Sequence, residues 1–209
     1  MPTKSGPEGR KASFIEEARR AQLIQCAIDT IAELGFAQAS VAQIAGRAGI
    51  SKSVITYYFS GKDELIRQVL TQIFTDAHRY IAPRVGAEQT VRLRLQAYIR
   101  AHIEFISTHL TQMAAVMEIA ANHRTEDGSL RWGGTADRPV RTALEGMLAR
   151  GQESGEFGAF DRSVMAVAIR RAIDALPPLM MSDPAVDAEV YARELVALFD
   201  RATRKESNG

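Results

Sequence analysis

The sequence predicts an all-α protein. Apolar residues recur at spacings of three and four along most of the chain, which is the period of an amphipathic helix. Runs of alternating apolar residues closed by hairpin turns, which would indicate strands, are nearly absent. Glycines, prolines and capping residues mark the ends of the helical stretches. With 209 residues, 46% of them hydrophobic, the chain can bury an ordinary globular core as one large domain or two small ones.

The first helix is expected over residues 14–34, after a flexible polar tail at residues 1–13. Leu23, Ala27 and Ile31 share one face of this helix, and Gly35 follows as its C-terminal stop. The single cysteine, Cys26, lies among apolar neighbours, so we interpret it as a small buried hydrophobe. One cysteine excludes an internal disulfide and any zinc site built on paired cysteines.

Three helix starts then fall within about 21 residues. Ser40 and Gln43 form a capping box for a second helix that Gly49 ends. Ser51 is positioned to cap a third helix of about two turns. Ser60 and Asp63 form another capping box, which opens a long fourth helix.

Five further helices are expected in the C-terminal part, over residues 88–108, 110–122, 138–152, 161–176 and 184–203. Pro177-Pro178 is expected to stop the fourth of these, and Asp183-Pro184 to start the last. The polar, glycine-rich residues 125–137 indicate a loop. We therefore expect a DNA-binding domain at 14–60, a second helical domain at 61–204 and a flexible tail at 205–209.

The second and third helices match a helix-turn-helix, in which the first helix braces the second and the second enters the major groove of DNA. Gly49 permits the left-handed backbone that the corner requires, and Ala45 and Ala48 are small enough for close approach. Short polar groups on the third helix can reach base edges or phosphates, whereas Ile55 and Phe59 are interpreted as core anchors.

Charge and motif content narrow the class of protein. Residues 1–62 carry eight Lys and Arg against five acidic residues, which gives weak support for a polyanionic partner of this end alone. No segment approaches the ~20 apolar residues of a membrane span, so we expect a cytoplasmic protein. The sequence lacks a phosphate-binding glycine loop, a GxSxG elbow and an HExxH site, which argues against an enzyme. The four histidines lack metal-ligand spacing, and we expect no cofactor.

Taken together, residues 18–66 resemble the N-terminal domain of TetR-type transcriptional repressors. The matching residues are Gly35-Phe36, Val41, Ile44-Ala45, Ala48-Gly49-Ile50-Ser51-Lys52, Tyr57-Tyr58-Phe59 and Lys62-Asp63-Glu64-Leu65. The resemblance implies a homodimer whose third helices enter successive major grooves of a near-palindromic operator. It also implies an all-helical C-terminal domain that dimerises, binds a small-molecule effector and changes the separation of the two DNA-reading parts. Residues near Gly155-Glu156-Phe157 and Phe160-Asp161 are similar to a BetI-like branch of the family.

The DNA contacts follow partly from the helix termini and partly from the resemblance. The expected set is Ser40, Ser51, Lys52, Ser53, Thr56, Tyr57, Tyr58 and Lys62. Free NH groups at the two helix starts, Ser40 and Ser51, can bind phosphate, and Lys62 can add a point charge to it. Packing between helices is the alternative for the two tyrosines, and a solvated surface position is the alternative for the lysines. Arg47 is interpreted as a surface or ion-pair residue. Thr56 stands where many relatives carry tyrosine, so the operator sequence cannot be copied from them.

For the C-terminal domain the residues themselves suggest two sites. An effector pocket is expected between the fourth helix and the middle helices, lined by Phe74, His78, Tyr98, His102, Phe105, Met113, Met117 and Trp132. Glu118 could recognise a cationic effector there. A dimer interface is expected at Met165, Ala168, Ile169, Ala172, Ile173, Leu195, Leu198 and Phe199, where apolar stripes exceed the needs of one helix contact. A purely intramolecular core is the alternative reading of these stripes.

The sequence therefore predicts a ligand-responsive, dimeric DNA-binding regulator, and more specifically a repressor. The fourth helix links the DNA-reading helices to the expected pocket, so it is the expected moving element. The alternative is an activator or helical adaptor that uses the same DNA-binding module.

Overall fold

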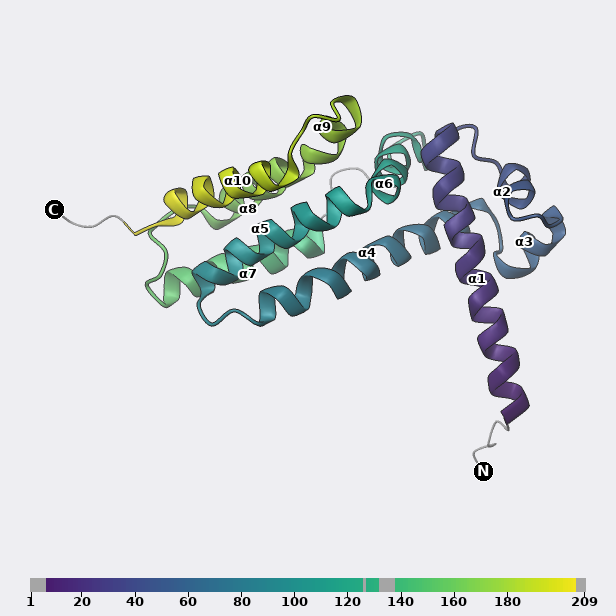
Figure 1. Ribbon diagram of the computed structural model, residues 1–209, viewed down its shortest axis with the longest axis horizontal. Helices are drawn as coiled ribbons and strands as arrows, with labels where there is room; N and C mark the ends of the chain where they lie inside the picture. Colours follow the sequence, from purple (N-terminus) through teal and green to yellow (C-terminus); the bar gives the residue numbers. More distant parts are fainter. Residues whose placement is uncertain (1–6, 126, 132–137, 206–209) are drawn as a thin grey trace.

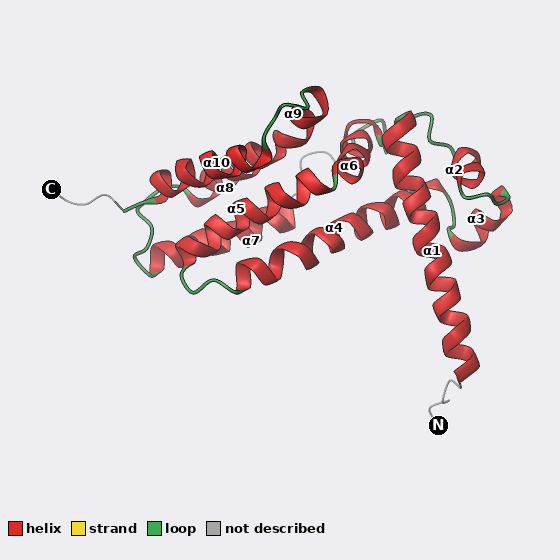
Figure 2. Ribbon diagram, viewed as in Figure 1, coloured by secondary structure: helices red, strands yellow, loops and turns green. Residues whose placement is uncertain are grey.

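A computed structural model describes residues 7–125, 127–131 and 138–205, and these residues form ten helices with no strand among them. The helices are α1 (Pro7–Leu34), α2 (Val41–Arg47), α3 (Lys52–Tyr58), α4 (Lys62–Gly86), α5 (Val91–Thr108), α6 (Leu110–Asn122), α7 (Arg138–Glu153), α8 (Arg162–Asp174), α9 (Leu176–Ser182) and α10 (Ala188–Thr203). Short loops join most of them (Figure 2). The all-α prediction is confirmed.

The helices form two parts, which we call the head (α1 to α3) and the body (α4 to α10). In Figure 1, α1 stands across one end of the body, with α2 and α3 beyond it, while α4, α5, α7, α8 and α10 run lengthwise side by side. The long helix α4 leads from the head along the body. None of the described helices is long and apolar enough to cross a membrane.

Two apolar cores hold these parts together. The first joins α1, α2 and α3 through fully buried residues such as Ile31, Ile44 and Phe59, and it continues into α4 and α6. Its α6 members, Ala115 and Ile119, are both fully buried. The second core fills the body between α5, α7, α8, α9 and α10. The head core thus extends beyond residue 60, because α4 and α6 close it from the body side.

A polar contact fixes the last helix of the body. The Asp200 carboxylate on α10 accepts hydrogen bonds from the Arg92 Nε and Nη2 atoms on α5, at 2.5 and 2.7 Å, and from Gln96 Nε2 at 3.0 Å. The Arg92 guanidinium, as the largest influence, holds the pKa of the Asp200 carboxyl well below its usual range. This contact joins two helices that are about a hundred residues apart in sequence.

Several helix boundaries differ from the predictions. Helix α1 begins at Pro7, seven residues before the predicted start at residue 14, and α5 begins at Val91, after a Thr90 cap rather than at residue 88. The proline pair Pro177-Pro178 does not end the helical region but opens α9. Proline is tolerated there because NH groups of a helix's first turn need no intrahelical acceptor.

Two predicted caps are also corrected. The long helix α4 has Gly61 as its N-cap, with no side-chain cap. The Glu64 carboxylate, one residue later than predicted, accepts from the Ser60 NH and hydroxyl, while Asp63 pairs with His123. Helix α10 is capped by Asp187, whose carboxylate accepts from the NH groups of Glu189 and Val190.

Candidate nucleic-acid interface

The corner between α2 and α3 has the geometry that the sequence predicts. Gly49 has φ of +65°, the left-handed conformation that glycine adopts without steric cost. The Gly49 NH donates to the Gly46 carbonyl at 3.1 Å, and the Ile50 NH donates to the Ala45 carbonyl at 3.0 Å. These two bonds are those of a Schellman motif, which ends a helix and turns the chain sharply. At the other end of α2, the Ser40 hydroxyl accepts from the Gln43 NH at 3.2 Å, which confirms one half of the predicted capping box. The other half is wrong, because the Ser40 NH donates to the Gln38 carbonyl at 2.8 Å.

Helix α3 divides into a buried side and an exposed side. Ile55 and Phe59 are almost fully buried in the head core, which confirms their interpretation as anchors. The exposed side carries Ser51, Lys52, Ser53, Thr56 and Tyr57. Since the anchors fix the rotation of the helix about its axis, these five polar side chains share one outward surface.

Tyr57 is the most conspicuous residue of this surface. Its side chain is 75% exposed, and its ring contacts that of the half-buried Tyr58 edge-on, with centroids 5.1 Å apart. A large ring left in water contributes little to the stability of the head. Its exposure therefore fits contact with a partner, whereas Tyr58, which packs on the head core, also has a structural role.

The hydroxyls near the start of α3 make local hydrogen bonds. Ser51 and Ser53 share one at 2.8 Å between their Oγ atoms, and Thr56 Oγ1 donates to the Ser53 carbonyl at 2.9 Å. Ser51 is the N-cap of α3, although its side chain makes no cap hydrogen bond. Arg47 pairs with Glu33 on α1, which confirms its interpretation as an ion-pair residue.

Lys62 has an internal position that the sequence did not predict. Its Nζ atom donates to the Phe36 carbonyl oxygen at 3.0 Å and lies 4.4 Å from the centre of the Phe36 ring. Burial, as the larger influence, lowers the pKa of this ammonium group, which the adjacent Asp63 partly offsets. The predicted phosphate contact of Lys62 is not supported by this placement, because the ammonium group is directed into the head. The remaining DNA contacts stay predictions.

In the body, two of the predicted pocket residues belong to a partly buried polar cluster. Tyr98 and His102, one turn apart on α5, have rings with centroids 4.1 Å apart, and Arg170 of α8 donates to the Tyr98 hydroxyl at 3.4 Å. The His102 Nδ1 atom lies 2.8 Å from the Tyr98 carbonyl oxygen. A carbonyl only accepts, so Nδ1 carries the proton and Nε2 keeps the lone pair. Burial above all, and then the Arg170 charge, lower the pKa of His102 to about 3, so its ring is neutral at pH 7.

The other predicted pocket residues lie in differing surroundings. Phe74 is 50% exposed and His78 is exposed, on the outer side of α4. Phe105 is buried against the His109 ring, with centroids 4.1 Å apart. Met113 and Met117 are half-buried on α6, and Trp132 lies outside the described residues. Glu118, considered for a cationic effector, instead accepts a hydrogen bond from the Phe36 NH at 3.0 Å. The sequence did not predict this contact, because Phe36 and Glu118 are 82 residues apart. It did not predict the role of Arg170 either, because Arg170 and Tyr98 are 72 residues apart.

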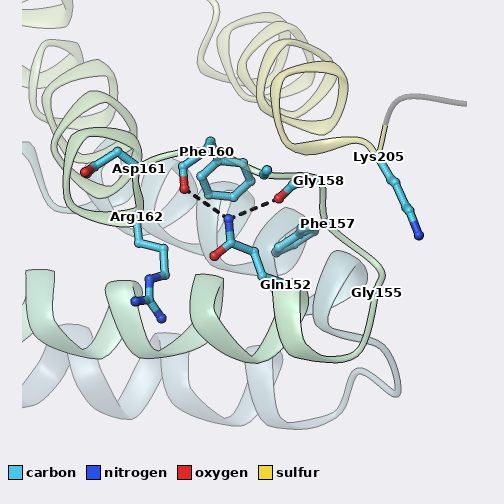
Figure 3. A pocket seen from close by; sticks show the side chains of 9 residues that line it. Gln152, Gly155, Phe157, Gly158, Phe160, Asp161, Arg162 and Lys205 are labelled. Atoms are coloured by element: carbon cyan, nitrogen blue, oxygen red, sulfur yellow. Dashed lines mark hydrogen bonds between the residues drawn. The ribbon is translucent and has the colours of Figure 1, made fainter. Parts of the chain in front are cut away.

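The body also has a surface hollow of about 660 Å³ between the end of α7 and the C-terminal residues. Figure 3 shows Gln152 at its floor, with Nε2 donating to the Gly158 and Phe160 carbonyl oxygens, each at 3.0 Å. The amide is thus used to shape the loop after α7. This hollow lies apart from the predicted pocket and holds none of its residues.

The predicted dimer residues separate into buried and accessible ones. Ile169, Ile173 and Phe199 are buried in the body core, so they are corrected to intramolecular packing. Met165, Ala172 and Leu195 are partly buried against the same core, whereas Ala168 and Leu198 are exposed. The outer faces of α8 and α10 carry further exposed apolar side chains outside the predicted interface set, namely Val164, Val167 and Val190.

Comparisons with known proteins agree with this architecture. Residues 23–69 match the model of the bacterial regulatory proteins, tetR family. The chain is 43% identical over 70 residues to the HTH-type transcriptional regulator BetI 1 of Chromohalobacter salexigens, covering 34% of this chain and 35% of the relative. It is 35% identical over 133 residues to BetI 2 of the same organism, covering 63% of this chain and 58% of the relative. The matches thus span between a third and three fifths of these relatives.

Among solved structures, the transcriptional regulator FadR from Bacillus subtilis, in complex with stearoyl-CoA, has a similar fold. The TM-score is 0.73 at 22% sequence identity, with 85% of this chain and 96% of that chain covered. An identity this low supports the shared fold alone. The head and the lengthwise helices of the body are therefore an arrangement that known regulators also have.

Proposed function

We propose that this chain, which belongs to the TetR family of bacterial regulatory proteins, is a transcriptional regulator that binds DNA through α3. The observation that carries the proposal is the exposed polar side of α3, on which Lys52, Thr56 and Tyr57 project from a helix anchored by Ile55 and Phe59. A helix placed in this way can enter a major groove with its polar side chains toward bases and phosphates. The corner at Gly49 fixes its angle to α2.

The finer proposal is a repressor that acts as a homodimer on a near-palindromic operator. Two copies of a two-turn reading helix are needed because one alone contacts few base pairs. The outer faces of α8 and α10 are suited to pairing, since Val164 is 68% exposed and Leu198 is 48% exposed. Burying these side chains against a second copy would contribute to association through the hydrophobic effect.

The proposal includes release by a small-molecule effector bound in the body. The cluster of Tyr98, His102 and Arg170 supplies polar groups within a largely apolar core, which is the composition of small-molecule sites. The FadR structure named above contains stearoyl-CoA, and this supports an effector in the body without identifying it. An effector would act by binding more tightly to a conformation that fits the operator poorly.

DNA binding is tested with double-stranded DNA that adjoins the gene for this chain, and with sites selected from a random library. We expect Tyr57→Ala to weaken binding about tenfold or more while sedimentation shows an unchanged oligomeric state. Leu93→Ala, which truncates an exposed side chain on α5 far from α3, is the matched control and should bind as the wild type does. Equal affinity of Tyr57→Ala and the wild type would refute the assignment of this surface.

Repression and activation are separated by a reporter fused to the selected DNA site. Deleting the gene should raise expression if the chain is a repressor. A fall in expression would favour the alternative, an activator with the same DNA-binding module.

A further inference from the structure

We propose that Glu118 is the positioning residue through which α6 holds the corner between α1 and α2. Displacement of the end of α6 would then reach the DNA-reading helices by direct contact, in addition to any route through α4. The inference rests on the proposed function, because it names the route by which the body would control the head. It concerns a junction that we define as Phe36, Lys62, Glu118 and His123.

The backbone NH of Phe36 is held by α6. It donates to Glu118 Oε2 at 3.0 Å, and Asn122 Nδ2 donates to the same oxygen at 3.2 Å from the next turn of α6. Gly35 makes room for the carboxylate, since it has φ of +78° and a Cβ atom there would lie only 3.3 Å from Oε2. The Glu118 carboxylate thus lies beside both Gly35 and Phe36 in the turn that follows α1.

The carbonyl oxygen and the ring of Phe36 also make contacts, with the start of α4 and with the residue after α6. Its carbonyl oxygen accepts from Lys62 Nζ at the start of α4, and its ring lies 5.1 Å from the His123 ring just after α6. His123, which is 4% exposed, lies with Nε2 3.2 Å from Asp63 Oδ1. One residue of the head is therefore in contact with both elements that enter from the body.

Packing makes α6 suited to transmit a movement. Ala115 and Ile119, on the same helix as Glu118, are fully buried in the head core. Helix α6 also packs more extensively on α1 than on α4. Because close-packed elements move together rather than deform, a shift of α6 would carry α1 with it.

From Phe36 the connection to the reading helices is short. The Gly35 carbonyl accepts from the Ala39 NH at 3.1 Å, and the next residue, Ser40, caps α2. Helix α2 leads into α3 through the corner at Gly49. A change in the position of the Phe36 NH is therefore passed on within five residues to the helix that braces α3.

The first experiment uses the full chain without DNA and follows amide hydrogen exchange. Hydrogen bonds to charged acceptors rank among the stronger ones, so Glu118→Ala should speed exchange at Phe36 and at the start of α2 about tenfold. Glu118→Gln keeps an acceptor oxygen at the same reach and should recover most of the protection. Thr111→Ala, at an exposed position on the same helix, is the control and should leave exchange unchanged.

The second experiment uses the reciprocity of coupling: if α6 influences the head, DNA bound to the head must influence α6. The probe is the double-stranded DNA selected by the wild-type chain from a random library. Its binding should change exchange at residues 118–123 in the wild type and in Glu118→Gln. In Glu118→Ala, measured at saturating DNA, that change should be lost. A merely structural role for Glu118 would not remove it.

Three outcomes would overturn the inference. They are unchanged exchange at Phe36 in Glu118→Ala, no response of residues 118–123 to bound DNA in the wild type, and a full response in Glu118→Ala. If the wild type selects no DNA, the proposed function fails, and the first experiment alone then decides whether Glu118 positions the corner.

Discussion

Two glycines of the head, three residues apart, should respond to alanine with opposite signs. Gly49 has φ of +65°, and Gly46 lies inside α2; a Cβ atom at either position would meet nothing within 4 Å. Neither alanine side chain would gain or lose contacts, so the two variants differ in stability only through the backbone conformation at each position. A side chain in the left-handed region costs about 1 to 2 kcal/mol, so Gly49→Ala should lower the free energy of unfolding by about 1 kcal/mol or more. Within a helix alanine is favoured over glycine by about 0.8 to 1 kcal/mol, so Gly46→Ala should raise the free energy of unfolding.

The assay is urea denaturation followed by circular dichroism at 222 nm. With a slope of about 2 kcal/mol/M, the two midpoints should lie about 1 M apart, on either side of the wild type. Gly49→Asn should fall between the wild type and Gly49→Ala, because asparagine tolerates the left-handed conformation better than alanine does. Equal midpoints for the two alanine variants, or a higher midpoint for Gly49→Ala, would refute the reasoning that the backbone at Gly49 fixes the corner.

Three further predictions concern His102, Gly151 and the pair Lys52 and Lys62. The free energy of unfolding of the wild type should fall as the pH drops from 6.5 toward 3, by up to about 1.4 kcal/mol per pH unit from His102 alone. The reason is that His102 takes up a proton in the unfolded chain, whereas in the folded chain its pKa is about 3 and it stays neutral. The free energy of unfolding of His102→Gln should depend less steeply on pH, and equal slopes for the two proteins would contradict a neutral, desolvated ring. Gly151→Ala would place a Cβ atom 2.1 Å from a ring atom of the buried Phe157. It should therefore lower the melting temperature and cost about 1 to 3 kcal/mol of stability. Gly146→Ala on the same helix is the control and should not lower it, because its Cβ atom would lie 3.6 Å from the nearest neighbouring atom. In DNA titrations over a salt series, Lys52→Gln should reduce the slope of log K against log salt by about 1, and Lys62→Gln should leave it unchanged; a reduced slope for Lys62→Gln would restore the phosphate contact first predicted for it.

The parts of the fold that local chemistry determines could be predicted from the sequence. The corner at Gly49 follows from one residue's backbone preference and the small residues beside it. The burial of Ile55 and Phe59, which fixes the exposed side of α3, follows from helical spacing. Helix α6 has the predicted bounds because a polar break precedes it and a loop follows it.

The features that depend on distant partners could not be predicted. Asp63 has the spacing of a capping residue, yet His123, 60 residues later, takes its carboxylate. Lys62 looks like a free surface cation until Phe36 is placed beside it by the turn at Gly35. The apolar stripes of α8 and α10 could not be assigned from periodicity either, because burial within one copy and burial between two copies follow the same pattern.

The apolar core of the head, which takes Ala115 and Ile119 from α6, limits how the head can be joined to the body of another protein. A chimera that joins residues 1–60 to a foreign body would expose the face of α1 that α6 covers, and would lose Glu118 at the Phe36 corner. Grafting only α2 and α3 would therefore transfer the exposed polar side of α3 without the core that holds it in place. A transferable unit must include α6 as well, although α6 lies fifty residues further along the chain.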